Sequence, residues 1–268
     1  IRGKALLKIH HNLPANKGIT FYLNSAYEDR ASYLQWRSIM EALRTEDGRL
    51  DDRVWSTKLN AAAVYKSGIP KRNMFFTAKI YENFYNWHTK IFNSNTRLYD
   101  LTGSVSTNTG VESQLMFARN DNIITGGAEL RASSTDSEDD MFGDHWGAGA
   151  AVFVNEEYNG FHPIVLNGGI RVDAFHADGA DKDAFVGFSP KLSSVYHLTE
   201  NSALRLKVSS GFRMPSMAEL FTNTTTSGII KVEPNPALKS EQGFTTEIGG
   251  NWVRGPFLFD GAVFYNYY

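Results

Sequence analysis

Residues 209–221 read SSGFRMPSMAELF, and residues 233–249 read EPNPALKSEQGFTTEIG. The first segment has the character of a strand that ends at Pro215, because proline cannot donate a hydrogen bond to a neighbouring strand. The second segment begins with two further prolines and continues into another strand-like run that reaches Gly249. Together the two segments predict an outgoing strand, a polar corner and a returning strand.

The residues just before this stretch alternate in character with a period of two. Leu204, Leu206 and Val208 are apolar, whereas Arg205 and Lys207 between them are charged. Such alternation is typical of a β-strand with two unlike faces. The pattern recurs along the chain and predicts an all-β fold of about a dozen strands. The expected strands lie near residues 4–13, 18–28, 53–66, 74–86, 103–118, 123–133, 146–158, 162–175, 185–198, 202–213, 241–254 and 256–268.

The predicted connections alternate in length. Short turns are expected at residues 13–17, 67–73, 119–122, 159–161, 199–201 and 254–256. Longer polar links are expected at residues 29–52, 87–102, 134–145, 176–184 and 214–240. A meander with short turns at one end and long loops at the other is typical of an outer-membrane barrel. Residues 32–43 have apolar side chains at near-helical spacing, which predicts a short helix inside the first long link.

The composition excludes several classes of function. The net charge of the 268 residues is −2, and this gives no electrostatic attraction for nucleic acid. Cysteine is absent, so neither a disulfide framework nor a thiolate metal site is possible. No apolar run approaches the roughly 18 residues of a transmembrane helix. The mean hydropathy of −0.33 is compatible with a barrel, because the two faces of barrel strands average out.

The alternation has two structural interpretations. In a bilayer only helices and closed barrels pair every backbone N–H and C=O group within the protein. A membrane-spanning chain with this pattern is therefore an antiparallel transmembrane β-barrel, with Arg205 and Lys207 turned into the lumen. Facing lipid at mid-membrane, each would cost about 2–4 kcal/mol. A soluble sandwich also alternates, with its apolar side chains turned inward, so periodicity alone leaves both folds open.

Several motifs, in order, resemble the barrel domain of TonB-dependent outer-membrane receptors. In that family a strand ends in an FRAP-like box, and an NPNL-like box precedes the next strand. The residues that match these boxes are Phe212, Arg213, Pro215 and Glu219, then Asn235, Pro236, Leu238 and Glu241. Met214 and Ala237 depart from the family pattern. Residues 169–173, 189–192 and 259–265 resemble further barrel strands, so the motifs cover about half of the chain.

The resemblance implies a fold, a location and a domain organisation. The complete barrel of the family has about 22 strands, of which this chain would supply around half. Residues 1–268 would then be a partial barrel domain. The plug domain, the motif that TonB contacts and the closing strands would lie outside these residues. The expected location is the outer membrane of a Gram-negative bacterium, with lipid around the barrel and the long loops outside the cell.

The resemblance also implies a function. A receptor of this family imports a scarce ligand with energy that TonB transmits to the plug. The substrate expected first is a ferric siderophore, followed by cobalamin, another metal chelate or a glycan. Haem is less favoured, because haem receptors of the family usually carry a histidine between the two boxes and residues 214–235 contain none. A passive pore or adhesin, and a soluble carbohydrate-binding sandwich, remain as alternatives from other classes.

Two groups of aromatic and basic residues are candidate ligand contacts. Aromatic rings beside a cation can hold a rigid, partly anionic ligand such as a ferric chelate. The candidates are Tyr33, Trp36 and Arg37 in the first long link, and Tyr85, Trp87 and His88 at the end of a strand. The alternative is an aromatic girdle at the membrane interface, which applies most to Tyr85 and Trp87.

Acidic residues crowd two long links that the meander places next to each other. They are Asp136, Glu138, Asp139 and Asp140 in one link, and Asp178, Asp181 and Asp183 in the other. Clustered carboxylates bind Ca²⁺ through oxygen ligands, and some members of the family bind calcium in such loops. The alternative is a pair of solvated acidic loops.

The box residues are expected to hold a corner of the sheet rather than to contact ligand. The sequence contains no nucleophile elbow, no phosphate-binding glycine loop and no zinc-protease helix. We therefore expect no enzymatic activity and no resident cofactor apart from the possible calcium, with a barrel hydrolase as the remote alternative.

Overall fold

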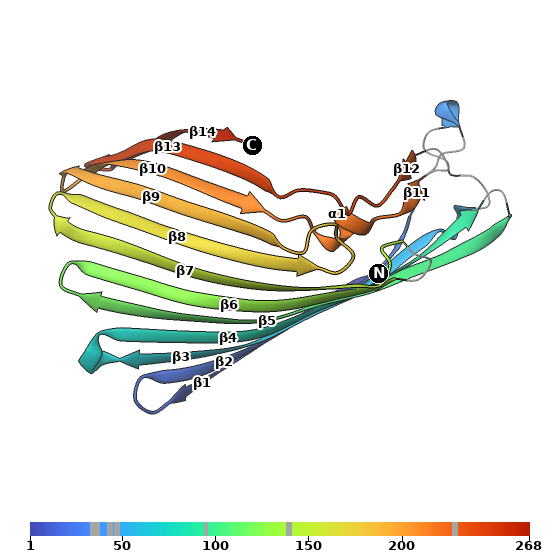
Figure 1. Cartoon of the computed structure of the whole chain (residues 1–268), viewed down its shortest axis with the longest axis horizontal. Coiled ribbons are helices and arrows are strands. Elements are labelled where there is room, and N and C mark those ends of the chain that lie inside the picture. Colours follow the sequence, from blue (N-terminus) through green and yellow to red (C-terminus); the bar gives the residue numbers. More distant parts are fainter. Residues whose placement is uncertain (33–37, 42–44, 46–48, 94–95, 138–140, 227–229) are drawn as a thin grey trace.

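The computed structural model describes residues 1–32, 38–41, 45, 49–93, 96–137, 141–226 and 230–268. Its main element is a 12-stranded antiparallel sheet in which the strands follow one another in the order β1-β2-β3-β4-β5-β6-β7-β8-β9-β10-β13-β14. Figure 1 shows these strands side by side as a curved, twisted sheet with the first and last strands at its two edges. The dozen predicted strands are all confirmed, and so is the all-β antiparallel class.

Several strands extend further towards the long loops than the sequence predicted. The main-sheet strands are β1 Arg2–Leu13, β2 Lys17–Ala31, β3 Arg53–Ile69, β4 Met74–Asn93, β5 Leu98–Arg119, β6 Asn122–Ser137, β7 His145–Phe161, β8 Ile164–Ala177, β9 Phe185–Thr199, β10 Ser202–Arg213, β13 Glu241–Arg254 and β14 Phe257–Tyr267. Between β10 and β13 lie α1 (Met217–Phe221) and a small hairpin of β11 (Thr224–Thr226) and β12 (Ile230–Val232). The hairpin and α1 are absent from the sequence prediction.

The short turns use residues that tolerate a left-handed backbone. Asn16, Asn73, Asn120 and Gly255 have φ values from +50° to +57°. Asparagine and glycine adopt this conformation at low cost, so two long strands can be joined by a few residues. We call this edge of the sheet the short-turn end and the opposite edge the long-loop end.

Two features of the long-loop end differ from the prediction. The expected link at residues 87–102 is mostly strand, because β4 and β5 continue to Asn93 and Leu98. This extension carries an edge-on ring contact between Phe92 and Tyr99. The carboxylate of the buried Asp52 accepts a hydrogen bond from the Phe92 amide (2.7 Å), which ties the extension to the preceding link. Within the predicted helix of residues 32–43, the described part contains a single 3₁₀ turn, η1 (Ile39–Glu41). Ser32 and Ser38 are described and are not helical, and residues 33–37 and 42–43 lie outside the described residues.

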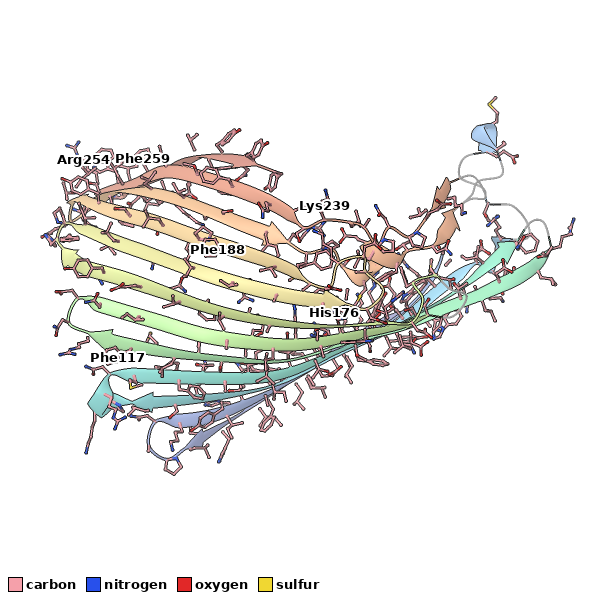
Figure 2. The ribbon with its side chains drawn as sticks, in the orientation of Figure 1. Phe117, His176, Phe188, Lys239, Arg254 and Phe259 are labelled. Atoms are coloured by element: carbon pink, nitrogen blue, oxygen red, sulfur yellow. The ribbon has the colours of Figure 1, made fainter. Side chains whose placement is uncertain are left out.

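One face of the sheet is apolar and uncovered. Leu206, Ile248 and Val263 lie opposite one another in the register of β10, β13 and β14, so their side chains share this face. They are 47%, 62% and 78% exposed, and Phe188 and Phe259 likewise project freely from the sheet (Figure 2). In the described part of the chain, no second sheet packs against this apolar face. A soluble sandwich would bury it, so that interpretation was wrong.

The opposite face carries most of the charged side chains of the strands, and several of them are paired with one another. We call it the charged face. Arg205 donates hydrogen bonds to Asp260 at 2.7 and 2.9 Å and to Glu247 at 3.3 Å. Arg171 similarly bonds Glu129 at 2.7 Å and Asp173 at 2.8–3.0 Å. These two arginines are thus paired with carboxylates along the sheet.

The separation of the faces has an exception. Glu82 lies on the apolar face, opposite Ala61 and Thr109, and its carboxylate accepts a hydrogen bond from the Thr109 hydroxyl.

Among the described residues, no helix is long and apolar enough to cross a membrane, and α1 has only five residues.

Charge placed on the two faces of β13 should have opposite consequences in a bilayer. We expect Ile248→Arg to destabilise the folded barrel by about 2–4 kcal/mol, because the new guanidinium faces hydrocarbon. Thr245→Arg, on the same strand but on the charged face, is the matched control and should cost under about 1 kcal/mol. Urea unfolding of the complete gene product in lipid vesicles measures both values. Equal destabilisation by the two variants would contradict the assignment of the faces.

Candidate functional site

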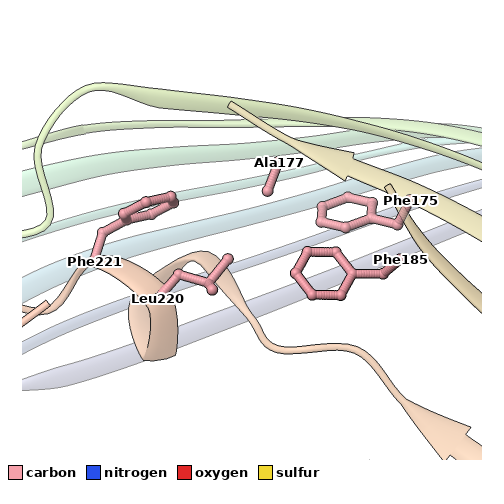
Figure 3. Packing of buried hydrophobic residues seen from close by; sticks show 5 residues of the cluster. All are labelled: Phe175, Ala177, Phe185, Leu220 and Phe221. Atoms are coloured by element: carbon pink, nitrogen blue, oxygen red, sulfur yellow. The ribbon is translucent and has the colours of Figure 1, made fainter. Parts of the chain in front are cut away.

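The candidate site lies at the long-loop end, where an apolar cluster holds α1 against the charged face. Phe175 and Ala177 come from the end of β8, Phe185 from the start of β9, and Leu220 and Phe221 from α1 (Figure 3). Leu220 is 0% and Phe185 1% exposed. Burial of each large side chain contributes about 1.5–3 kcal/mol. The connection between β10 and β13 is therefore anchored to the wall at this point.

The first turn of α1 is closed by a capping box. The Ser216 hydroxyl accepts a hydrogen bond from the Glu219 amide at 3.3 Å, and the Glu219 carboxylate accepts one from the Ser216 amide at 2.9 Å. This reciprocal arrangement satisfies two amide groups that a helix start would otherwise leave without a partner. Ser-x-x-Glu is visible in the sequence at residues 216–219, although the helix was not predicted from it.

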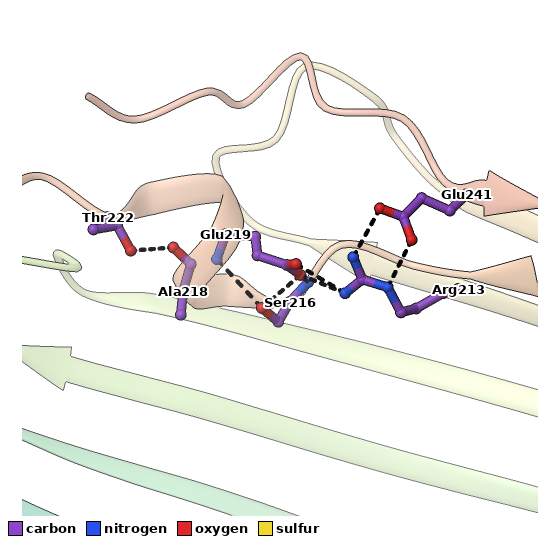
Figure 4. A network of polar contacts seen from close by, with 6 residues as sticks. All are labelled: Arg213, Ser216, Ala218, Glu219, Thr222 and Glu241. Carbon is purple, nitrogen blue, oxygen red and sulfur yellow. Dashed lines mark hydrogen bonds and ion pairs between the residues drawn. The ribbon is translucent and has the colours of Figure 1, made fainter. Parts of the chain in front are cut away.

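Arg213 connects this helix to the strands on both sides of the connection. Its guanidinium bonds both oxygens of Glu219 at 2.8 and 2.9 Å and both oxygens of Glu241 at 3.0 Å (Figure 4). Arg213 ends β10 and Glu241 begins β13, so one side chain links the outgoing strand, the helix and the returning strand. The planar guanidinium suits two bidentate carboxylate contacts, a geometry that lysine does not offer.

The same contacts alter the acidity of the two carboxyl groups. Hydrogen bonds from the Ser216 amide, from Arg213 and from the Ser216 hydroxyl lower the pKa of Glu219 from 4.5 to about 2. The hydrogen bond from Arg213 also lowers the pKa of Glu241 below its ordinary value. Both groups are therefore ionised at neutral pH, and the corner is held by charge-assisted hydrogen bonds.

Three loops meet around α1. The ring of His145 stacks on the ring of Phe221 with centroids 3.5 Å apart, and His145 Nδ1 lies 3.1 Å from the carbonyl oxygen of Asp178. The Asn223 amide donates to the Met141 carbonyl at 2.7 Å, and the Asp181 amide donates to the Pro236 carbonyl at 3.1 Å. The β6–β7, β8–β9 and β10–β13 connections thus form one assembly at the long-loop end.

The remaining box residues lie inside this assembly. Phe212 lies against Gly187, where an added Cβ would be 2.0 Å from its ring. Pro215 is buried, and Leu238 packs on the apolar cluster. The amide of Asn235 donates to the Leu220 carbonyl at 2.8 Å, and Pro236 accepts from Asp181 as described. The boxes therefore lie together with α1 and the neighbouring loop.

The aromatic candidates are divided between the faces. Tyr85 and Trp87 lie on the charged face, and Trp87 makes an edge-on contact with Phe142 at 6.2 Å. His88 lies on the other face, where it stacks with Trp55 at 5.4 Å. An aromatic girdle at the membrane interface would lie on the apolar face. The positions of Tyr85 and Trp87 on the charged face therefore favour an interior location over a girdle. Tyr33, Trp36 and Arg37 lie outside the described residues.

The acidic candidates are only partly described. Asp178 and Asp181 lie in the three-loop assembly, and the carbonyl of Asp183 is 2.7 Å from His176 Nδ1. Asp136 is the second-last residue of β6 and so lies next to the β6–β7 connection. Glu138, Asp139 and Asp140 lie outside the described residues. Among the residues that the structure places, no group of three His, Asp or Glu side chains is arranged to hold a metal ion. Calcium binding in these loops stays a prediction.

The sequence analysis did not predict the strand residues of the apolar cluster, Phe175 and Phe185. Phe175 follows Arg171 and Asp173 on the charged face, so it is an aromatic residue at a position where the pattern calls for a polar one. Phe185 repeats this break at the start of the next strand. Apolar residues on the charged face near a loop end are thus a signal for a segment that folds back onto the wall.

The corner should be insensitive to mild acid and should weaken only in stronger acid. Because the pKa of Glu219 is lowered from 4.5 to about 2, its stabilising effect is complete well above pH 4.5, declines progressively below that value and is lost as the pH falls through about 2. We expect the amide hydrogen exchange of residues 214–223, corrected for the intrinsic rate, to show the same protection at pH 5.5 and pH 7 and less protection at pH 3. Glu219→Ala should exchange several-fold faster at pH 5.5 and pH 7, and the difference should narrow at pH 3. Glu233→Ala, which removes an exposed carboxylate paired with Lys231, is the control. A difference between the natural protein and Glu219→Ala that is as large at pH 3 as at pH 7 would contradict the expected pKa.

Phe212 should require glycine beneath it. We expect Gly187→Ala to displace the ring and to reduce the free energy of unfolding by about 1–3 kcal/mol, because the new methyl group occupies the position of the ring. Gly211→Ala is the matched control, since no atom lies within 4 Å of an added Cβ there. Urea unfolding in vesicles compares the two variants. If Gly187→Ala were as stable as Gly211→Ala, the ring contact would be unimportant.

Comparison with solved structures supports the architecture. The hemophore receptor HasR of Serratia marcescens, in complex with its hemophore HasA and heme, superposes with a TM-score of 0.75 at 17% identity. The FrpB iron transporter of Neisseria meningitidis has a TM-score of 0.77 at 12% identity, and the siderophore receptor PirA of Pseudomonas aeruginosa one of 0.74 at 14%. Each alignment covers 99% of this chain and 45% of the other. The chain therefore spans less than half the length of these receptors, and at such identities the likeness shows the fold alone.

A family model settles the membership. No curated protein matches the sequence. The model of the TonB dependent receptor-like β-barrel matches residues 9–268, which is nearly the whole chain and includes both boxes. TonB-dependent receptor barrels lie in the outer membrane of Gram-negative bacteria. The protein belongs to the TonB-dependent receptor family, and its twelve-stranded sheet is barrel wall of that family.

Proposed function

We propose that this chain forms wall and loops of an outer-membrane active transporter that imports a scarce ligand, a ferric siderophore in the first place. The observation that carries the proposal is the inverted polarity of the sheet. Its apolar face is exposed as lipid contact requires, and its charged face carries the loop assembly. A wall of this kind encloses a polar lumen whose long-loop end is partly covered by folded loops.

The proposed orientation follows from the lengths of the connections. We place the long loops outside the cell and the short turns in the periplasm, as in other outer-membrane barrels. Ligand would then meet the loop assembly first and pass along the charged face. We assign the contact with TonB to the plug of the complete receptor. Energy for import would come through TonB, so the barrel itself has no need of an enzymatic site.

The choice of substrate rests on chemistry and on the relatives. The names of the similar structures include a siderophore receptor, an iron transporter and a hemophore receptor bound to heme. A charged face rich in lysine, arginine and tyrosine suits an iron chelate better than an uncharged glycan. We therefore rank ferric siderophores first, then cobalamin and other metal chelates, then glycans. Haem ranks lower because residues 214–235, between the FRAP-like and NPNL-like boxes, contain no histidine.

Growth on defined iron sources tests this function. We expect a strain lacking the gene to lose growth on at least one ferric chelate as sole iron source, and a plasmid copy of the complete gene to restore it. Restoration should require an intact TonB system, because import against a gradient needs energy at this membrane. Limiting cobalamin and limiting glycans serve as parallel conditions that identify the alternative substrates.

Two results would redirect the assignment. Restored uptake that persists without TonB would indicate a passive pore. Unchanged growth of the deletion strain under every iron, cobalamin and glycan condition would contradict the proposed transport function.

A further inference from the structure

The charged face of β1–β4 is unusually basic. Its cationic side chains are Arg2, Lys4, Lys8, Arg30, Lys58, Lys66 and Lys79. Glu28 is the one carboxylate on this face among the described residues of the four strands, and it bonds Arg2 at 2.6 Å. Lys79 bonds Glu112 of β5 at 3.1 Å. In the described part of the wall, Lys4, Lys8, Lys58 and Lys66 form no hydrogen bond or close ion pair with a carboxylate, and Lys58 acts on Glu28 through its charge alone.

On β5–β14 the same face carries several carboxylates as well as cations. Glu129 and Asp173 bond Arg171, and Glu247 and Asp260 bond Arg205. The basic patch is therefore a local property of β1–β4 rather than a general property of the lumen. A one-signed patch beside a low-dielectric wall focuses its field and raises the local concentration of anions.

The strand register arranges these lysines in steps along the wall. Lys4, Ala26, Lys58 and Tyr85 lie in one row across β1–β4, towards the long-loop end. Four residues further along the strands, Lys8, Tyr22, Ala62 and Tyr81 form the next row. Lys66 lies another four residues towards the short turns. At about 3.3 Å per residue the steps are roughly 13 Å apart.

Tyrosine rings accompany the ammonium groups. Lys58 Nζ lies 4.7 Å from the centroid of the Tyr85 ring, Lys8 Nζ 5.4 Å from that of Tyr22, and Lys79 Nζ 4.4 Å from that of Tyr81. The Tyr81 ring lies over Gly110, where an added Cβ would be 2.3 Å from it. Contact with a ring leaves the ammonium charge in place, so the lysine can still donate a hydrogen bond to an anion. The rows of Lys58 and Lys8 thus offer a positive charge together with an aromatic surface, and Lys66 adds a further positive charge.

We propose that Lys4, Lys8, Lys58 and Lys66, with Tyr22, Tyr81 and Tyr85, form a track for an anionic metal chelate whose donor groups are carried on aromatic rings. Phenolate oxygens of such a chelate accept hydrogen bonds from the ammonium groups, and its rings stack on the tyrosines. The inference rests on the proposed transport function and deepens it, because it names the charge and the chemical class of the cargo. Neutral and cationic chelates gain nothing from the track.

Paired charge-removal variants of the complete receptor test the track. The track variant carries Lys8→Gln, Lys58→Gln and Lys66→Gln. The control variant carries Lys191→Gln, Lys207→Gln and Lys239→Gln, which removes the same charge elsewhere on the wall and loops. The probes are the radiolabelled ferric complexes of a tris-catechol ligand, which is anionic, and of a tris-hydroxamate ligand, which is neutral. Outer-membrane amounts of both variants are matched before uptake rates are compared.

We expect the receptor to import the anionic chelate, and the track variant to do so at least about tenfold more slowly, with the difference shrinking at high salt. The control variant should keep the original rate. Equal rates for the two variants, or import of the neutral chelate alone, would overturn the track while leaving the transport function in place. An equal loss for both chelates would assign the lysines to holding the receptor's own plug, and would also overturn the inference. Absence of TonB-dependent import of either chelate, or of any other tested ligand, would instead contradict the proposed function.

Discussion

The rest of the structure depends on the unbroken pairing of backbone N–H and C=O groups from β1 to β14. In hydrocarbon an unpaired backbone group costs several kcal/mol, so every strand inside the membrane must be hydrogen-bonded on both sides. Continuous pairing forces alternate side chains onto opposite faces along the whole sheet. Leu206 and Ile248 therefore share the exposed apolar face, while Arg205 bonds Glu247 on the charged face. One constraint produces both the insulating surface and the polar lining.

The cationic side chains of the charged face are stabilised in two ways. Arg171 on β8 and Arg205 on β10 are held between carboxylates, which balances their charge within the wall. On β1–β4, Lys8 and Lys58 lie beside tyrosine rings instead, and we propose that these lysines meet a passing anion. The long-loop end adds a third arrangement, in which Arg213 joins α1 to two strands over an apolar cluster. The charged face thus carries three different arrangements, which are the paired arginines, the lysines beside tyrosines and the loop assembly.

Prediction from the sequence succeeded where a pattern is local. Period-two alternation located all twelve main strands, and the two prolines of the boxes marked the corner after β10. The β4–β5 connection was predicted too long, because its ends are extended by Phe92, Tyr99 and Asp52, contacts between residues distant in sequence. The candidates Tyr85, Trp87 and His88 are consecutive or nearly so, yet the pleat sends His88 to the opposite face. The acidic loops were predicted to be neighbours, and the contact of His145 with Asp178 confirms that proximity.

The sequence by itself determined the all-β class, the strand positions, the two unlike faces and the family, because each depends on residue order within one strand or one motif. Only the tertiary structure decided which residues share a row across strands, that α1 packs on Phe175 and Phe185, and that lysines of β1–β4 lie in successive rows. The physical reason is register. A strand's own sequence specifies which residues share a face, but the partner opposite each residue depends on the turns and packing of neighbouring strands.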